Sequence, residues 1–226
     1  MNTRLLVLPC AALLLWSGCT RQPQALQLPV VSQQDSVLCL QENIAYRSNV
    51  DAEFRNDPDS PFRRDTSITF TGIRWFPIDV RFRQRAVLQR MAQPETVVVL
   101  GTKGEPRKQL RYGYFDLVLP DEHGAPVAVR LNVYKFTPSD SLRYARYRDH
   151  LSMWFTDLTT GKETYHVGRY IELGEELPGR DALYTIDLNK AFNPYCAYSA
   201  LYSCAIPTDK DRLPIALRVG EMTYHE

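Results

Sequence analysis

The clearest pattern in this chain is an alternation of apolar and polar residues in two neighbouring segments, 110–119 and 127–134. In the second segment every other residue is apolar, which predicts a β-strand with one face against a core; these residues are Val127, Val129, Leu131 and Val133. The first segment changes phase in its middle, from the face of Leu110 and Tyr112 to the face of Leu117 and Leu119. This change of phase predicts a β-bulge near Tyr114 or Phe115.

The sequence PDEHGAP, which lies between these two segments, predicts a hairpin connection because Gly124 accepts a positive φ. Further short runs predict strands at residues 67–76, 80–88, 96–101, 151–155, 163–173, 183–187 and 215–221. Many short strands with polar turns and no regular helical spacers are typical of all-β folds. We therefore expect a mainly β protein, an antiparallel sandwich or barrel-like sheet, with an N-terminal helix.

The N-terminal helix is predicted from apolar residues that recur near helical spacing. Ser36 is the expected N-cap, Val37, Leu40 and Ile44 form the apolar series, and the pattern ends around Phe54. The turn-forming sequence NDPDSP follows at residues 56–61. The helix should therefore begin the folded part of the chain and pack its apolar series inward.

The first nineteen residues have the pattern of a bacterial lipoprotein signal. Arg4 precedes an apolar run from Leu5 to Trp16, and the small residues Ser17 and Gly18 stand directly before Cys19. An apolar run of this length fits a cleaved secretory signal, whereas a spanning helix needs about twenty apolar residues. We expect a signal peptide at 1–18, lipidation of Cys19, a tether at 19–35 and one β-rich domain at 36–226; the alternative is plain secretory cleavage.

Lipidation at Cys19 would make a membrane the partner of this protein and would place the domain in the cell envelope, facing the periplasm. Thr20 stands where an Asp would indicate inner-membrane retention, so we favour the outer membrane. The only basic residue of the leader is Arg4, so the mature chain carries equal numbers of basic and acidic residues. A neutral chain of this kind makes nucleic acid a poor candidate partner.

The segment from Asp157 to Arg169 predicts a hairpin with two alternative interpretations. In the structural one, the side-chain oxygens of Asp157 and Thr159 satisfy turn amides. In the functional one, Glu163, Tyr165 and Arg169 project from one face of a strand and form a ligand site with Asp157. An Arg beside a carboxylate binds an anionic ligand or forms a structural ion pair.

A second candidate ligand site is the polar loop that follows residue 186. Polar side chains of such loops commonly satisfy buried backbone groups, while tyrosines and amides also suit a cleft for a polar small molecule, glycan or peptide. The candidate ligand-binding residues of this loop are Asp187, Asn189, Asn193, Tyr195 and Tyr198.

Cys196 and Cys204 are close in sequence, and the expected compartment is oxidising. We therefore predict a disulfide between them, with Cys39 unpaired; free thiols are the alternative. Neither cysteine has the spacing of a zinc site, and the partial calcium-loop pattern fails because Gly168 stands where its closing Glu should be. We expect no metal site and no cofactor.

The chain also contains no hydrolase signature, and His123, His150 and His225 are expected to be solvated residues. Carboxylates alone suffice for glycoside chemistry. A hydrolase acting on envelope carbohydrate or ester substrates would draw on Asp157, Glu163, Asp187 and Glu221.

Three segments in the C-terminal third, MWFTDLTTGKETYHVGRY, LYTIDLNKAFNPYCAYSALYSCAIP and LPIALRVGEM, resemble an uncharacterised bacterial family. That family is catalogued as domain of unknown function sixteen eighty-four, and DPDSPF and GIRWFPID upstream resemble it as well. The resemblance implies a protein that is often a lipoprotein and whose biochemical role is undetermined. The chain departs from the family pattern at His166, Ala205 and Asp211.

Taken together, these patterns favour a lipid-anchored envelope protein that recognises a polar small ligand or an envelope partner without catalysis. The hydrolase just described is the first alternative. A purely structural envelope component is the second.

Overall fold

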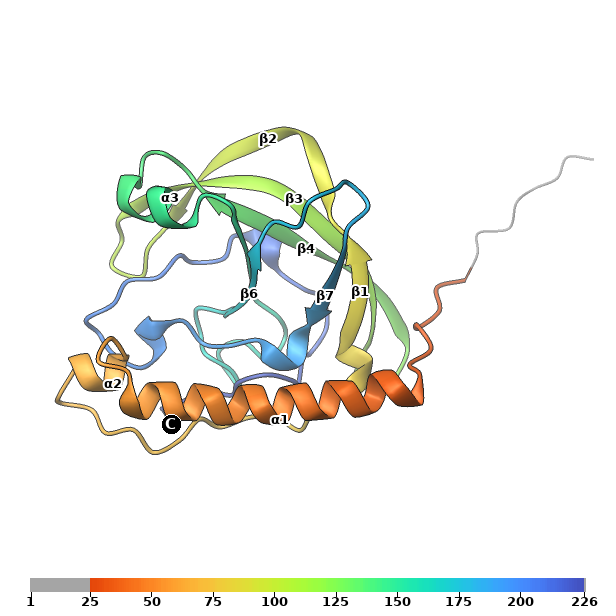
Figure 1. Cartoon of the computed structure of the whole chain (residues 1–226), viewed down its shortest axis with the longest axis horizontal. Coiled ribbons are helices and arrows are strands. Elements are labelled where there is room, and N and C mark those ends of the chain that lie inside the picture. Colours follow the sequence, from red (N-terminus) through yellow and green to blue (C-terminus); the bar gives the residue numbers. More distant parts are fainter. Residues whose placement is uncertain (1–24, 226) are drawn as a thin grey trace, which may run out of the picture.

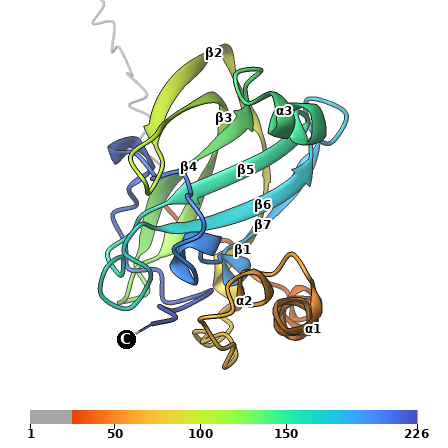
Figure 2. The same cartoon turned by 90° about the vertical axis from the view of Figure 1, so that its left-hand side faces the viewer.

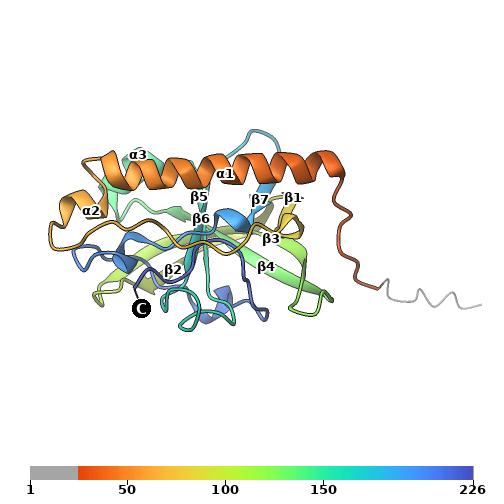
Figure 3. The ribbon, with the colours of Figure 1, turned by 90° about the horizontal axis from the view of Figure 1, so that it is seen from below.

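The computed structural model describes residues 25–225, so the predicted signal peptide at 1–18 and the predicted lipidation site Cys19 lie outside the described residues. A long helix, α1 (Gln33–Asn56), crosses one end of a β-rich body, and a short helix, α2 (Pro61–Arg64), follows it (Figure 1). Seen along its axis, α1 lies beside the strands and not between them (Figure 2). From below, α1 runs across the ends of the strands (Figure 3).

The N-terminal helix is confirmed, but its start and its buried face differ from the prediction. The helix begins at Gln33, within the predicted tether, because the Ser32 hydroxyl oxygen caps it by accepting from the Asp35 amide at 3.0 Å. The residues that it buries are Cys39, Asn43 and Phe54. The predicted inward series is exposed instead, with Val37, Leu40 and Ile44 between 41 and 63 % exposed.

Five strands form one antiparallel sheet in the order β2-β3-β4-β5-β6. Their bounds are β2 (Gln89–Leu100), β3 (Pro106–Pro120), β4 (Pro126–Phe136), β5 (His150–Phe155) and β6 (Arg169–Glu175), and the helix α3 (Ser141–Tyr147) connects β4 to β5. The β3–β4 register shifts between Arg111 and Gly113, so the predicted bulge exists but lies at Tyr112. The turn between these strands holds Gly124 at a φ of 81°, as predicted.

A separate antiparallel pair is formed by β1 (Arg83–Val87) and β7 (Leu183–Asp187). No backbone ladder within residues 25–225 joins this pair to the five-stranded sheet, so the strands do not close into a barrel. The mainly β, antiparallel class with an N-terminal helix is confirmed. Short 3₁₀ turns complete the fold at Val80–Phe82, Leu188–Lys190, Tyr195–Ala197 and Asp209–Asp211.

The main core lies between the five-stranded sheet, the β1–β7 pair and the segment 213–219. Phe115, Leu131, Met153 and Ile186 are completely or almost completely buried there. The opposite face of the sheet is covered by the segment around Ala205, which packs against the stacked rings of Tyr134 and Trp154. Both faces of the sheet are therefore covered at residues 131–134 of β4, where polar as well as apolar positions are buried.

Asp211 fixes this covering segment to the sheet. Its carboxylate accepts hydrogen bonds from the Tyr134 hydroxyl at 2.8 Å and from the Asn132 side-chain amide at 2.9 Å. A second carboxylate oxygen caps its own 3₁₀ turn by accepting from the Thr208 amide and hydroxyl. One of the positions at which this chain departs from the family pattern is thus a structural anchor.

Four of the predicted strands are wrong in whole or in part, and one of them is 80–88, whose first three residues form a 3₁₀ turn so that β1 begins only at Arg83. Segments 67–76 and 215–221 are extended but irregular, and they contribute only the isolated bridge between Trp75 and Glu221. The predicted strand 163–173 begins only at Arg169, because Gly168 adopts a φ of 123° and lies where a Cβ would come within 2.6 Å of the Phe155 carbonyl oxygen. In these segments the alternation of apolar and polar residues indicates which face is buried, although no strand pairs with them.

No helix within residues 25–225 combines the length and the apolar character needed to cross a membrane.

Candidate functional site

The predicted pair of Asp157 and Arg169 exists as a fully buried ion pair. The guanidinium and the carboxylate are 2.8 Å apart, and each side chain is at most 1 % exposed. Arg169 also donates to the backbone carbonyls of Leu217, Val219 and Glu221, while Asp157 accepts from the Thr159 amide at 2.8 Å. These contacts join the loop after β5 to the C-terminal segment, so the structural interpretation of this pair is the one that the geometry supports.

Glu163 and Tyr165 do not join Arg169 on one face, because residues 163–168 form turns. The Glu163 carboxylate instead forms an ion pair with Arg218 at 2.9 Å at the surface. The Tyr165 hydroxyl donates to the Cys196 carbonyl oxygen at 3.1 Å. The predicted cluster of Asp157, Glu163, Tyr165 and Arg169 is therefore not formed as a single site.

Asp187 and Asn189 are buried beneath α1. The Asp187 carboxylate accepts from the Asn43 side-chain amide at 2.7 Å and from the Asn189 backbone and side-chain amides at 3.0 and 2.9 Å. Asn189 also bonds to the backbone of Asp79, accepting at 2.8 Å and donating at 2.9 Å. The buried Asn43 is thus explained by a partner more than a hundred residues away in the chain.

Asn193 and Tyr198 converge on Glu221, a carboxyl group that is only 1 % exposed. The Glu221 carboxyl accepts from the Tyr198 hydroxyl at 2.5 Å and from the Asn193 backbone amide at 2.8 Å, and the Asn193 side chain donates to the Met222 carbonyl at 2.8 Å. Desolvation raises the Glu221 pKa to about 7 in spite of these bonds.

The predicted disulfide is not formed: Cys196 and Cys204 are free thiols, as is Cys39. Proximity was predicted correctly, because the Cys204 sulfur accepts from the Cys196 amide at 3.4 Å. The Cys204 sulfur thus lies beside Cys196, and the loop is closed by hydrogen bonds without a bond between the two sulfurs. Tyr195 lies beside them and is 40 % exposed, with its ring edge-on to those of Phe54 and Tyr202.

These placements make most of the predicted ligand residues part of the scaffold. Asp157, Arg169, Asn189, Asn193 and Tyr198 are all buried and hydrogen-bonded to internal partners, and only Arg169 Nε and Asn193 Oδ1 among their side-chain polar atoms are buried without one. Arg169, Asp187, Asn193 and Tyr198 do not line a common pocket in the described part of the chain, where Asp187 lies in the wall of a cleft.

That cleft has a volume of about 480 Å³ and lies between β6, β7 and the inner side of α1. Its apolar surface comes from both strands and from the loops that flank them, and this surface consists of Ile171, Leu173, Leu177, Leu183, Tyr184 and Phe192. Its polar lining consists of Glu42, Tyr46, Arg83, Glu172, Thr185, Asp187 and Lys190. An apolar hollow with a few convergent polar groups is the usual form of a small-ligand site.

Most of the charges in the cleft are paired with one another. The Glu42 carboxylate lies 2.8 Å from the Arg83 guanidinium and 3.7 Å from the Lys190 ammonium. Arg83 also lies 3.8 Å from Asp187 and is largely buried. These groups hold α1 against the β1–β7 pair and leave little free charge to attract an anion.

Glu172 is the exception, because its carboxyl group forms no hydrogen bond or ion pair within the described part of the chain. The side chain has solvent access, and the surrounding protein raises its pKa to about 7 by desolvation. A carboxyl group with a raised pKa in a cleft is a candidate for contact with a ligand. A hydrogen-bond donor or a cation on a ligand would complement this carboxyl group.

Five residues of the cleft were not predicted as site residues from the sequence: Glu172, Glu42, Tyr46, Arg83 and Lys190. Glu172 had a usable signal, since it is an acidic residue on the face of a predicted strand opposite the apolar Ile171. The other four come from three separate elements, and only the tertiary packing of α1 brings them together.

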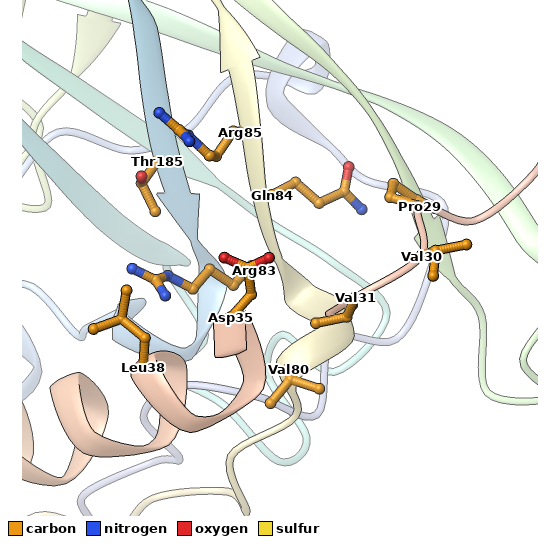
Figure 4. Close-up of a pocket in the computed structure, with 10 residues that line it drawn as sticks. All are labelled: Pro29, Val30, Val31, Asp35, Leu38, Val80, Arg83, Gln84, Arg85 and Thr185. Carbon is orange, nitrogen blue, oxygen red and sulfur yellow. The ribbon is translucent and has the colours of Figure 1, made fainter. Parts of the chain in front are cut away.

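A smaller hollow of about 260 Å³ adjoins the cleft and shares Arg83 and Thr185 with it. It lies between the segment 29–31, the start of α1 and β1, and Figure 4 shows the Arg83 side chain extending from β1 across this space. Arg83 therefore stands between the two hollows. Leu38 and Val31 give the smaller one an apolar wall (Figure 4).

Within residues 25–225, no three His, Cys, Asp or Glu side chains are grouped so that they could hold a metal ion.

The fold and the cleft define a mainly β antiparallel protein with one helix packed across the ends of its strands and a cleft beneath it. Comparison with protein families matches residues 68–222 to the family described as "Protein of unknown function (DUF1684)", and the chain belongs to this family. The predicted family is thereby confirmed.

The chain is also similar to an uncharacterised protein of Haloarcula marismortui, whose structure was determined in solution by NMR. The two are 28 % identical, the match covers 85 % of this chain and 98 % of that chain, and the TM-score is 0.59. A search of curated proteins found no match.

Proposed function

We propose that this protein is a non-catalytic binding protein that holds a small ligand in the cleft between β6, β7 and α1. The observation that carries the proposal is the unpaired carboxyl group of Glu172 in a cleft that is also lined by the apolar side chains of Ile171, Leu173 and Phe192. The ligand that fits has an apolar body and presents an amine or another hydrogen-bond donor to Glu172, because a buried apolar body contributes affinity and a charged hydrogen bond contributes orientation.

The carboxylates available to a hydrolase support binding over catalysis. Asp157, Asp187 and Glu221 are at most 5 % exposed and are held by internal hydrogen bonds, while Glu163 is paired with Arg218 at the surface. A glycosidase needs two carboxyl groups that flank one substrate bond in an open cleft. No two of these four carboxyl groups face each other across an open cleft.

We further propose that the protein is lipidated at Cys19, is cut before it, and faces the periplasm from a membrane, with the outer membrane favoured. The support is the sequence pattern of Arg4, the apolar run 5–16 and the small residues before Cys19. Metabolic labelling with a fatty-acid analogue tests this, with Cys19→Ser as the variant. Loss of label and release from the membrane fraction are expected, whereas an unlabelled wild-type protein contradicts the proposal.

The ligand proposal is tested with three six-carbon probes that differ only in their head group: hexylamine, hexanol and hexanoate. In titration calorimetry at pH 8, hexylamine should bind at least tenfold more tightly than hexanoate. The variant Glu172→Gln should abolish this preference, because it removes the negative charge and keeps the size of the side chain.

The matched control is Glu175→Gln, which removes an exposed carboxylate from the same strand outside the cleft. This variant should retain the preference of the wild-type protein. Equal discrimination by wild type and Glu172→Gln would contradict the proposed site.

A further inference from the structure

β6 and β7 each present an unpaired backbone edge to the same cleft. β6 is hydrogen-bonded to β5 on one side, and its other side is paired only at Tyr170, which forms an isolated bridge with Phe192. β7 is paired with β1 on one side only. From Ile171 to Glu175, and along β7, no other strand within residues 25–225 pairs with these edges, although residues of both strands line the cleft.

An exposed strand edge offers a row of amide and carbonyl groups, and an extended chain satisfies them by adding as a further strand. Edges are usually covered or protected in monomeric proteins. Here the loop 176–182 joins β6 to β7 and contributes Leu177 to the lining of the cleft, and Figure 1 shows the two strands side by side with this loop above them.

The side chains around these edges suit alternate residues of an extended peptide. Leu173, Leu183 and Tyr184 give an apolar surface between the two strands. Successive side chains of a strand point to opposite faces, so every second residue of an added strand would face that surface.

The acidic side chains of β6 limit which kind of chain can add to its free edge. β6 carries Glu172 and Glu175, both exposed, and the Glu172 carboxyl group forms no hydrogen bond or ion pair within residues 25–225. A second copy of this chain adding through its own β6 would bring these acidic side chains against the same acidic side chains, which is unfavourable. A segment with a Lys or Arg would instead place its cation at Glu172.

We propose that the cleft binds an extended peptide segment of a partner protein, added as a strand along the free edge of β6, with apolar side chains between β6 and β7 and a Lys or Arg side chain at Glu172. This inference rests on the proposed function, since it names the class of ligand that the same cleft takes.

The test uses the folded protein, residues 19–226, and two heptapeptides of alternating Val and Thr with Lys at the centre. The peptides differ only in that one is N-methylated at alternate backbone amides, on the edge that would face β6. Isotope-labelled protein is titrated with each peptide and, separately, with hexylamine, while the amide signals of residues 171–175 are followed by NMR.

We expect the unmodified peptide to shift these amide signals, to slow their hydrogen exchange at least tenfold, and to bind at least tenfold more tightly than the N-methylated peptide. Glu172→Gln should weaken binding of the peptide with central Lys more than binding of a peptide with central Gln. Glu175→Gln should leave the difference in affinity between these two peptides unchanged.

Two outcomes overturn the inference. One is equal affinity for the two peptides, because backbone pairing then contributes nothing. The other is that hexylamine binds in the cleft while the peptide does not change the signals of residues 171–175. In that case the small-ligand function is retained and only the peptide inference fails. If neither hexylamine nor the peptide binds, the proposed function fails together with the inference.

Discussion

The Arg169 guanidinium lies 2.8 Å from the Asp157 carboxylate at the point where the loop after β5 meets the C-terminal segment. Because Arg169 also donates to three backbone carbonyls of residues 217–221, its removal would leave a buried charge and several buried acceptors without partners. We predict that Arg169→Ala lowers the free energy of unfolding by about 3 to 5 kcal/mol. Urea denaturation followed by circular dichroism measures the change.

The control for this prediction is Arg218→Ala, which breaks the Arg218–Glu163 pair at the surface. Surface ion pairs contribute roughly 0 to 1 kcal/mol, so this variant should be nearly as stable as the wild type. A folded Arg169→Ala protein of unchanged stability would contradict the structural role of the buried pair and would return Arg169 to the candidate ligand residues.

Glu221 should make stability depend on pH. Burial raises its pKa in the folded protein from 4.5 to about 7, so the folded state binds the proton more tightly than the unfolded state. Its contribution to stability is fully present below pH 4.5 and is lost as the pH rises through 7. Glu221→Gln removes this loss. The free energy of unfolding of the variant, relative to that of the wild type, should therefore rise by up to roughly 3 kcal/mol between pH 4 and pH 8.

The measurement for Glu221 is the difference in unfolding free energy between wild type and Glu221→Gln at each pH, because titration of the other groups cancels in that difference. A difference that stays constant from pH 4 to pH 8 would show that Glu221 does not hold its proton in the folded state.

The Asp211 carboxylate accepts two hydrogen bonds from β4 and two from Thr208. We predict that Asp211→Ala destabilises the protein by about 2 to 4 kcal/mol, because the buried Tyr134 hydroxyl and Asn132 amide lose their acceptor. Tyr134→Phe removes only one donor and should cost about 1 kcal/mol. Thermal unfolding should rank the two variants in this order, and the reverse order would contradict the anchoring role of Asp211.

The sequence predicted the elements whose burial follows a simple period. β4 alternates Val129, Leu131 and Val133 against the core, and both β4 and its hairpin to β3 are confirmed. The segment 215–221 has the same kind of apolar alternation, yet its buried residues Leu217 and Val219 pack without a paired strand. Periodicity reports which side chains are buried and does not report whether a strand lies alongside.

The face of α1 and the cleft could not be predicted because both depend on distant partners. Asn43 points inward since Asp187, far along the chain, accepts its hydrogen bond, while Val37 and Ile44 remain exposed. The same packing brings Glu42 to Arg83. Residue type was enough to predict that the Asp157 carboxylate accepts from a turn amide. The place of Glu172 in the cleft depends on the elements that pack around it.

The thiols of Cys196 and Cys204 provide the last prediction. Hydrogen bonds from the Cys204 thiol and, more weakly, the Tyr165 hydroxyl lower the pKa of the half-buried Cys196 to about 6, against the opposing effect of desolvation. The thiolate is the reactive form, so alkylation of Cys196 by iodoacetamide in the reduced protein should have its midpoint well below the pH 9 of an ordinary thiol. Peptide mass spectrometry distinguishes Cys196 from the other cysteines. Cys204→Ala should move the midpoint upward, and Tyr165→Phe should move it less; a midpoint near 9 in the wild type would contradict this network.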